Sequence, residues 1–241
     1  LLSDAYEYLG RMKDAEKTLR QSFEVPSLQE NVTLDKRGWL FFLMSRGRDA
    51  DAVDAAKTLA AKPWAAVRAM GHIAASHALM AMGQMPEASA EAKAAVTEYQ
   101  SEPAAAPYLA PYMAGLQGEF FYRTGQAGKG RTLLETIEPK ILAESGPEAW
   151  GQGLFMLDAI ARFAISVSDW DLAEFTARQM DEYDPGYAGT HFALALVAEH
   201  RGSASEALKD FKLAREGWKN ADPDLPEMAQ VKAKIAALGG P

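Results

Sequence analysis

The 241-residue sequence contains no cysteine, which excludes disulfides, thiolate metal ligands and a cysteine nucleophile. A reducing cytoplasm and an oxidising periplasm both accept such a chain, so the compartment stays open between the two. No apolar run approaches the roughly 20 residues that cross a bilayer. The densest cluster, Trp39 to Met44, is six residues long. We therefore expect a soluble protein with no membrane span.

Basic residues are few and do not gather in one stretch. The formal net charge is −8 at pH 7, and such a charge repels a phosphate backbone, so nucleic acid is not expected as a partner. With 48% hydrophobic residues, the composition is that of a globular chain with a substantial core. The sequence does not open with a basic-then-apolar signal, and we interpret it as a fragment or a processed chain.

Motifs for catalysis and metal binding are also missing. His72 and His77 are five residues apart, about 140° around a helix, and no HExxH pattern accompanies them, which favours packed or solvent-facing histidines. The stretch "GQAGKGRT" from Gly125 lacks both the Lys-Ser/Thr pair and the preceding strand of a phosphate-binding loop. No GxSxG nucleophile motif occurs. The sequence therefore predicts no enzyme activity, no metal and no cofactor.

The chain does contain a repeat, in which a turn residue is followed five positions later by a small residue. The six pairs are Gly10 with Ala15, Gly47 with Ala52, Gly83 with Ala88, Gly125 with Gly130, Ser168 with Ala173, and Gly202 with Ala207. Mostly small residues stand seven positions before each turn, and apolar residues stand four before and nine after it. This register predicts two helices around each turn, each with one apolar stripe.

Prolines and one threonine indicate where the helices end and begin. The expected stops after second helices are Pro26, Pro63 and Pro185. The expected starts of first helices are Thr33, Pro63 and Pro147. In the fourth unit, the helix either starts late or is kinked at Pro111.

The segments "YLGRMKDAEKTL", "AMGQMPEASAEA" and "HRGSASEALKDF", together with the 34-residue interval from Ser168 to Gly202, resemble tetratricopeptide repeats. The likeness is to a divergent bacterial member of that family. His72 and His191 occupy the register where an aromatic commonly opens the first helix, and two intervals between turns are 42 and 43 residues long. The resemblance implies a single all-α domain: an α-solenoid of about six antiparallel helical hairpins with a C-terminal capping helix. The expected units are residues 1–30, 31–63, 64–101, 102–145, 146–185 and 186–222, with the capping helix in 223–241.

In this family the first helix of each pair lines a concave groove, so the resemblance implies a partner-binding face on those helices. The candidate groove residues are Arg37, Phe41, Met44, His77, Met80, Tyr112, Glu119, Tyr122, Arg123, Asp158, Arg162 and Phe192. Methionine and aromatic side chains suit a peptide or protein segment with apolar side chains. Some family members grip a C-terminal carboxylate with Asn and Lys, and neither occurs in this set. An alternative for Asp158 and Arg162 is that they pair with each other, four residues apart on one helix.

The leading hypothesis is a non-enzymatic protein–protein interaction module, in which Tyr122→Ala or Phe41→Ala weakens a partner without lowering the melting temperature. An alternative is a C-terminal oligomerisation or regulatory repeat domain of a larger protein. A third is a helical-repeat enzyme, such as an α/α barrel, which requires the repeats to close into a ring.

Overall fold

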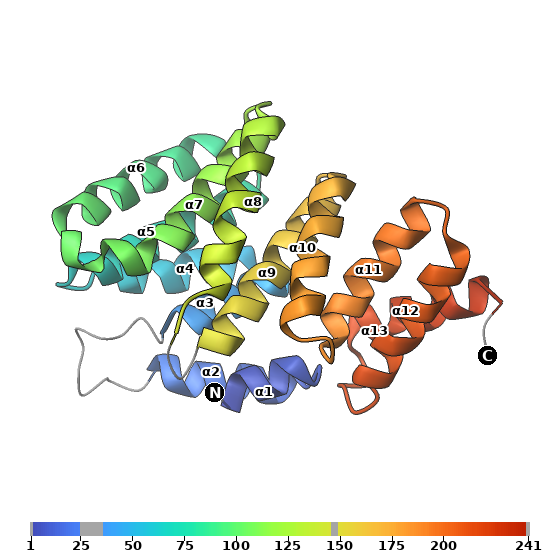
Figure 1. Ribbon diagram of the computed structural model, residues 1–241. Helices are drawn as coiled ribbons and strands as arrows, with labels where there is room; N and C mark the ends of the chain where they lie inside the picture. The colour runs from blue at the N-terminus through green and yellow to red at the C-terminus, as the bar shows by residue number, and fades with distance from the viewer. Residues whose placement is uncertain (1, 25–35, 146–148, 240–241) are drawn as a thin grey trace. The chain divides into compact units, whose positions relative to one another are not determined.

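The computed structural model describes residues 2–24, 36–145 and 149–239, and all regular structure within these ranges is helical (Figure 1). The helices are α1 Leu2–Tyr8, α2 Met12–Glu24, α3 Arg37–Ser45, α4 Asp49–Ala60, α5 Ala65–Ala81, α6 Met85–Ser101, the 3-10 helix η2 Pro103–Ala105, α7 Ala106–Arg123, α8 Ala127–Leu142, α9 Ala149–Ser166, α10 Trp170–Tyr183, α11 Ala188–His200, α12 Ala204–Gly217 and α13 Pro226–Ala237. The prediction of an all-α fold is confirmed. Among the described helices, none is long and apolar enough to cross a membrane.

The chain forms two compact units. The central unit is Leu19–Ile137, and the terminal unit combines Leu1–Thr18 with Glu138–Pro241. In the central unit α4, α5, α6 and α7 pack against one another largely in chain order, and in the terminal unit α9 to α13 do the same (Figure 1). Helices α2 and α8 contribute residues to both units.

All six predicted turn residues adopt a left-handed backbone, with φ from 59° at Ser168 to 78° at Gly202. The turn after α5 is representative: Gly83 N–H donates to the Met80 carbonyl (3.0 Å) and Gln84 N–H to the Leu79 carbonyl (2.9 Å). These two bonds form the Schellman motif that ends a helix, and glycine suits it because it has no Cβ to oppose a positive φ. The predicted turns are therefore confirmed residue by residue.

The small-residue columns mark where the two helices of a hairpin approach most closely. The residues five after and seven before the turn are buried in all six hairpins. Across α5 and α6, the Ser76 hydroxyl donates to the Ala88 carbonyl at 2.8 Å. Across α7 and α8, a Cβ on Gly130 would lie 2.8 Å from the Gly118 carbonyl oxygen. Larger side chains in these columns would push the paired helices apart.

The proline signals agree with the helix ends where they can be compared. Helix α5 begins two residues after Pro63, and α10 ends two residues before Pro185. Helix α7 begins at Ala106 and continues through Pro111, so it does not start late. Pro26, Thr33 and Pro147 lie outside the described residues.

Candidate functional site

An aromatic–arginine cluster joins α3 and α7 in the central unit. It consists of Arg37 and Phe41 on α3, and Tyr108 and Tyr112 on α7. The Arg37 guanidinium donates to the Tyr108 hydroxyl and lies 5.3 Å from the Tyr108 ring centroid and 6.0 Å from that of Tyr112. The Phe41 ring stacks on Tyr112 at 5.6 Å. Each ring is thus held by a neighbour, which restricts its rotamers.

Burial within this cluster is graded from the protein interior to its surface. Arg37 is 6% exposed and Tyr112 7%, whereas Tyr108 is 36% exposed. Phe41 is half-buried. The interior members therefore fix the geometry, while Phe41 and Tyr108 present apolar surface to solvent.

A second cluster, of charged side chains, joins α5 to α7. His77 Nδ1 lies 2.7 Å from Glu119 Oε2, and the Arg123 guanidinium donates to Glu119 Oε1 at 3.1 Å. Burial of the Glu119 carboxyl opposes its ionisation, but the hydrogen bond from His77 and the charges of His77 and Arg123 outweigh it and lower its pKa. Burial, with the charge of Glu119, raises the pKa of Asp49. Glu119 is therefore a charged link between two first helices.

The remaining predicted groove residues of the central unit differ in exposure. Met80 is 0% exposed and belongs to the core. Met44 and Tyr122 are half-buried. A Cβ on Gly130 would lie 2.6 Å from the Tyr122 ring, so Tyr122 packs closely against the second helix of its hairpin. Truncating Tyr122 would therefore remove packing within the fold as well as surface.

In the terminal unit, Asp158 and Arg162 pair with each other, which is the alternative left open by their spacing. Arg162 Nε donates to Asp158 at 2.7 Å, and Arg162 Nη1 donates to Glu227 at 2.8 Å. Asp158 is 9% exposed and Glu227 8%. Burial opposes the Arg162 charge, but Asp158, Tyr187 and Glu227 together raise its pKa. Burial, reinforced by Asp158, also raises the pKa of Tyr187 well above its ordinary value. This triad is a structural ion-pair network that ties α9 to α13.

Phe192, the last groove candidate, belongs to the apolar core. Its ring centroid lies 5.7 Å from that of Trp218 and 6.4 Å from that of Phe211, and it is 7% exposed. This placement gives it a packing role between α11 and α12.

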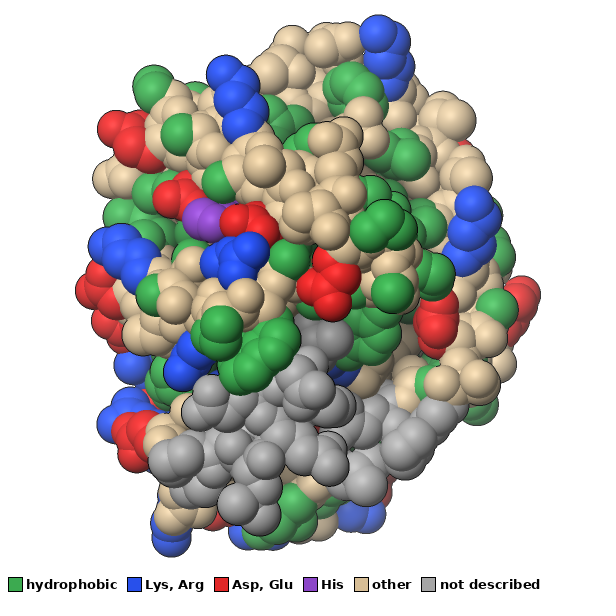
Figure 2. Space-filling view, turned by 90° about the vertical axis from the view of Figure 1, so that its left-hand side faces the viewer, with side chains coloured by type: hydrophobic (Ala, Val, Ile, Leu, Met, Phe, Trp, Pro, Cys, Tyr) green, Lys and Arg blue, Asp and Glu red, His purple; other side chains and the backbone are tan. Residues whose placement is uncertain are grey.

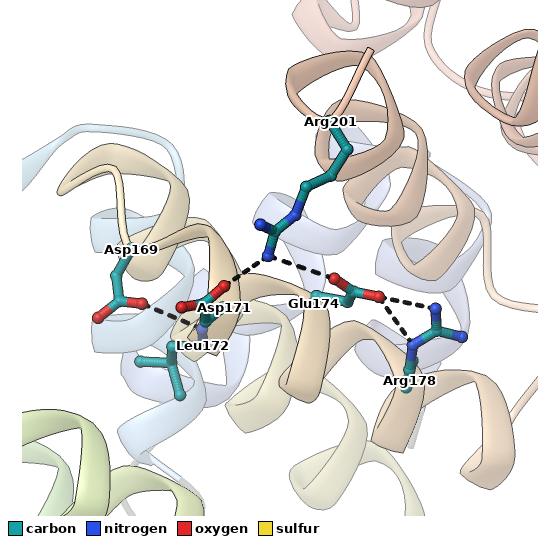
Figure 3. Close-up of polar contacts among 6 residues, drawn as sticks. All are labelled: Asp169, Asp171, Leu172, Glu174, Arg178 and Arg201. Atoms are coloured by element: carbon teal, nitrogen blue, oxygen red, sulfur yellow. Dashed lines mark hydrogen bonds and ion pairs between the residues drawn. The ribbon is translucent and has the colours of Figure 1, made fainter. Parts of the chain in front are cut away.

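Surface charges elsewhere form local networks. In Figure 3, Arg201 reaches from the end of α11 to Asp171 (2.5 Å) and Glu174 (3.5 Å) on α10, and Arg178 contacts Glu174 at 2.7 Å. Asp169 caps α10 by accepting a backbone N–H at 3.1 Å. On the face drawn in Figure 2, acidic and basic side chains are interspersed with hydrophobic ones. Among the described residues, no group of three or more His, Asp or Glu could hold a metal ion.

Sequence reasoning missed Tyr108, Tyr187 and Glu227. Tyr108 stands four residues before Tyr112 on the same helix, and this i, i+4 spacing was a usable signal. Glu227 lies at the start of α13, far along the chain from Arg162, and no local pattern links the two. Comparison with protein-family models and with curated proteins finds no match for this chain.

Proposed function

We propose that this chain is a non-enzymatic protein–protein interaction module, and that the aromatic–arginine cluster on α3 and α7 is its binding surface. The observation that carries the proposal is the pre-organised set of rings around Arg37, with Tyr108 36% exposed. Tyrosine and arginine are the residues most often found as energetic anchors of interfaces. Because their geometry is already fixed, little rotamer entropy is lost when a partner binds.

The repeat architecture supports this use. Six Schellman turns in one register and buried small residues in two columns are what a tetratricopeptide-like solenoid of hairpins requires. In such an array, α3, α5 and α7 are the first helices of successive hairpins and share one face. The aromatic–arginine cluster and the His77–Glu119–Arg123 cluster both lie on those helices.

The chemistry of the clusters favours a peptide or protein segment with apolar side chains near a polar group. Phe41 and Tyr108 offer ring surface to an apolar or aromatic side chain. Arg123 lies farther along α7, and its 34%-exposed side chain, held by Glu119, offers a positive charge for a flanking residue. This pairing of an apolar anchor with a polar neighbour matches the core-and-rim composition of protein interfaces.

A displayed library of random 12-residue peptides tests the proposal. We expect selection against the wild-type chain to enrich peptides that lose binding by about tenfold or more to Tyr108→Ala, since an interface anchor contributes about 1–2 kcal/mol or more. Tyr99→Ala is the matched control, because Tyr99 is a half-buried tyrosine on the second helix α6 of the same unit. Equal losses in the two variants, at equal melting temperatures, would contradict the assignment.

Self-association is the competing explanation for such a surface. Sedimentation velocity across a concentration series separates the two cases. A chain that stays monomeric while binding the selected peptides supports the interaction module. If the chain is instead a dimer that dissociates on Tyr108→Ala, the interaction module is contradicted and the same cluster serves oligomerisation.

A further inference from the structure

The connection between α10 and α11, residues 184–187, is held to the terminal unit at two points. The first is Asp184, whose carboxylate accepts hydrogen bonds from the Tyr8 hydroxyl of α1 (3.2 Å) and from the Trp150 indole N–H of α9 (3.1 Å). The second is the Pro185 carbonyl, which lies 2.9 Å from a histidine ring nitrogen of α11. This short segment is therefore where contacts from α1, α9 and α11 meet.

That histidine, His191, faces a hydrogen-bond acceptor with each of its ring nitrogens. Nδ1 lies 3.3 Å from Asp210 Oδ1 on α12, and Nε2 lies 2.9 Å from the Pro185 carbonyl oxygen. A neutral imidazole has one N–H to donate, whereas an imidazolium has two. A carbonyl oxygen accepts and does not donate, and the same holds for an ionised carboxylate. Both contacts are therefore hydrogen bonds only while His191 is protonated.

The surroundings of the His191 ring favour its protonated form. The hydrogen bond to Asp210 raises the pKa of His191 against the opposing effect of burial. The hydrogen bond to Pro185, the charge of Asp210 and the charge of Asp181 on α10 raise this pKa further. The ion pair of α9 described above acts on Tyr187, at the end of the connection. The charges that act on the ring thus come from α10 and α12.

Deprotonation of His191 removes one of its two hydrogen bonds, and the charge of the acceptors decides which one. A hydrogen bond to a carboxylate is stronger than one to a neutral carbonyl, so the remaining proton stays on Nδ1, facing Asp210, although that contact is the longer of the two. Nε2 then directs a lone pair at the Pro185 carbonyl oxygen, and the two acceptors repel each other. The neutral ring keeps its link to α12 and loses its link to the connection.

We propose that His191 is a pH-sensitive switch that controls the order of the α10–α11 connection. When it is protonated, it ties the Pro185 carbonyl to α11. When it is neutral, it releases that carbonyl, so that the segment bearing Asp184 is held less firmly against Tyr8 and Trp150. This inference concerns the terminal unit and does not depend on the proposal for α3 and α7.

The direction of the pH dependence follows from the raised pKa. The hydrogen bond to Pro185 is complete below the ordinary histidine pKa of 6.5 and is lost as the pH rises through the raised pKa of folded His191. The connection is therefore ordered in acid and loosens in base.

Nitrogen chemical shifts of the His191 ring, recorded over a pH titration of the full chain, test where the protons lie. We expect both ring nitrogens to carry a proton at low pH, and Nδ1 alone to carry one at high pH. A neutral ring that is protonated at Nε2 would overturn the proposal, because the hydrogen bond to Pro185 would then survive deprotonation.

Hydrogen exchange over the same pH range tests whether the connection loosens. The reporters are the N–H groups of Tyr187 and Thr190, two buried residues, which donate to the carbonyls of Asp184 (3.3 Å) and Tyr187 (3.1 Å). After correction for intrinsic exchange, we expect their protection to fall by about tenfold as His191 deprotonates, since a hydrogen bond to a charged group contributes about that much. The amides of α12 should keep their protection. An equal fall in α12, or no fall at the two reporters, would contradict the switch.

Three variants assign the pH step to His191. His191→Gln removes the titrating group, and His72→Gln is the matched control, because His72 Nδ1 also contacts a carboxylate on the next helix, Glu91 Oε2, at 2.6 Å but in the other unit. We expect the step at Tyr187 to disappear in His191→Gln and to remain in His72→Gln. Asp210→Asn, which preserves side-chain size, should move the step to lower pH. A step that persists in His191→Gln, or that does not move in Asp210→Asn, would overturn the proposal.

Discussion

The left-handed turns lead to a prediction about stability. Gly→Ala in a turn and Gly→Ala inside a helix should change the free energy of unfolding in opposite directions. Gly83 lies in a Schellman turn with φ of 75°, and Gly115 lies inside α7. A Cβ added at either position meets nothing within 4 Å, so steric overlap contributes to neither change. The backbone conformation is therefore the difference that remains between them.

The magnitudes follow from that difference. At Gly83, a left-handed alanine costs about 1–2 kcal/mol, and about 0.4–1 kcal/mol of this is offset because alanine restricts the unfolded chain. Gly83→Ala should therefore destabilise by about 1 kcal/mol. At Gly115 the helical backbone suits alanine, so the same substitution should stabilise by about 0.5–1 kcal/mol. Ser168 is the one turn residue that is not glycine, and Ser168→Gly should stabilise by about 0.5 kcal/mol.

Thermal unfolding followed by circular dichroism measures these changes. For a chain of this length, 1 kcal/mol moves the melting temperature by about 2–4 °C. We expect the Gly83→Ala midpoint to fall and the Gly115→Ala midpoint to rise. Shifts of the same sign and size would refute the reasoning, because the turn at Gly83 would then not require a left-handed backbone.

Three further predictions concern other interactions. Arg162→Ala should destabilise by about 3 kcal/mol because it leaves two buried carboxylates unpaired, whereas Arg178→Ala, which loses an exposed pair, should cost less than about 1 kcal/mol in the same urea titration. The hydrogen bond to Asp210 raises the pKa of His191. The contribution of protonated His191 to folding stability is therefore complete below the ordinary pKa of 6.5 and is lost as the pH rises through the pKa of the folded state. An NMR titration should place the His191 pKa above 6.5 and show a fall in Asp210→Asn; an unchanged value would contradict the assignment. Gly130→Ala should destabilise by about 1–2 kcal/mol despite better helix propensity, because its Cβ would lie 2.6 Å from a tyrosine ring, and a neutral result would mean that the ring relaxes.

The hairpins were predictable because their signals are local. A Schellman turn needs its glycine at one fixed position, and a close helix contact needs a small residue such as Ala88 at another, so both requirements appear directly in the sequence. Helix α13 shows the same logic, since Val231 and Ile235 share its buried face.

It was harder to predict from the sequence which of the predicted groove residues reach the surface and which are buried. The predicted groove residues stand ten, six, three and two positions before the turns, yet Met80 and Phe192 among them are core residues, while Phe41 and Met44 are half-buried. Whether a side chain on one of these helices packs or faces solvent depends on its neighbours on other helices. The Arg37–Tyr108 contact joins residues 71 positions apart, beyond the reach of any periodic pattern.

No sequence pattern predicted how α1 packs against the rest of the terminal unit. Tyr8 and Asp184 are 176 positions apart. Each is unremarkable alone, since a tyrosine near a helix end and an aspartate after one are common. Only the folded terminal unit brings them together.

The most direct test of the proposed function is site-specific photo-crosslinking in the cells that produce the protein. A photoreactive phenylalanine analogue replaces Tyr108 in one chain and Tyr99 in the control chain. If the aromatic–arginine cluster is the binding surface, the Tyr108 chain forms a discrete protein adduct that Phe41→Ala abolishes, and the Tyr99 chain does not. Adducts of equal yield at both positions, or an adduct at Tyr108 that survives Phe41→Ala unchanged, would contradict the account.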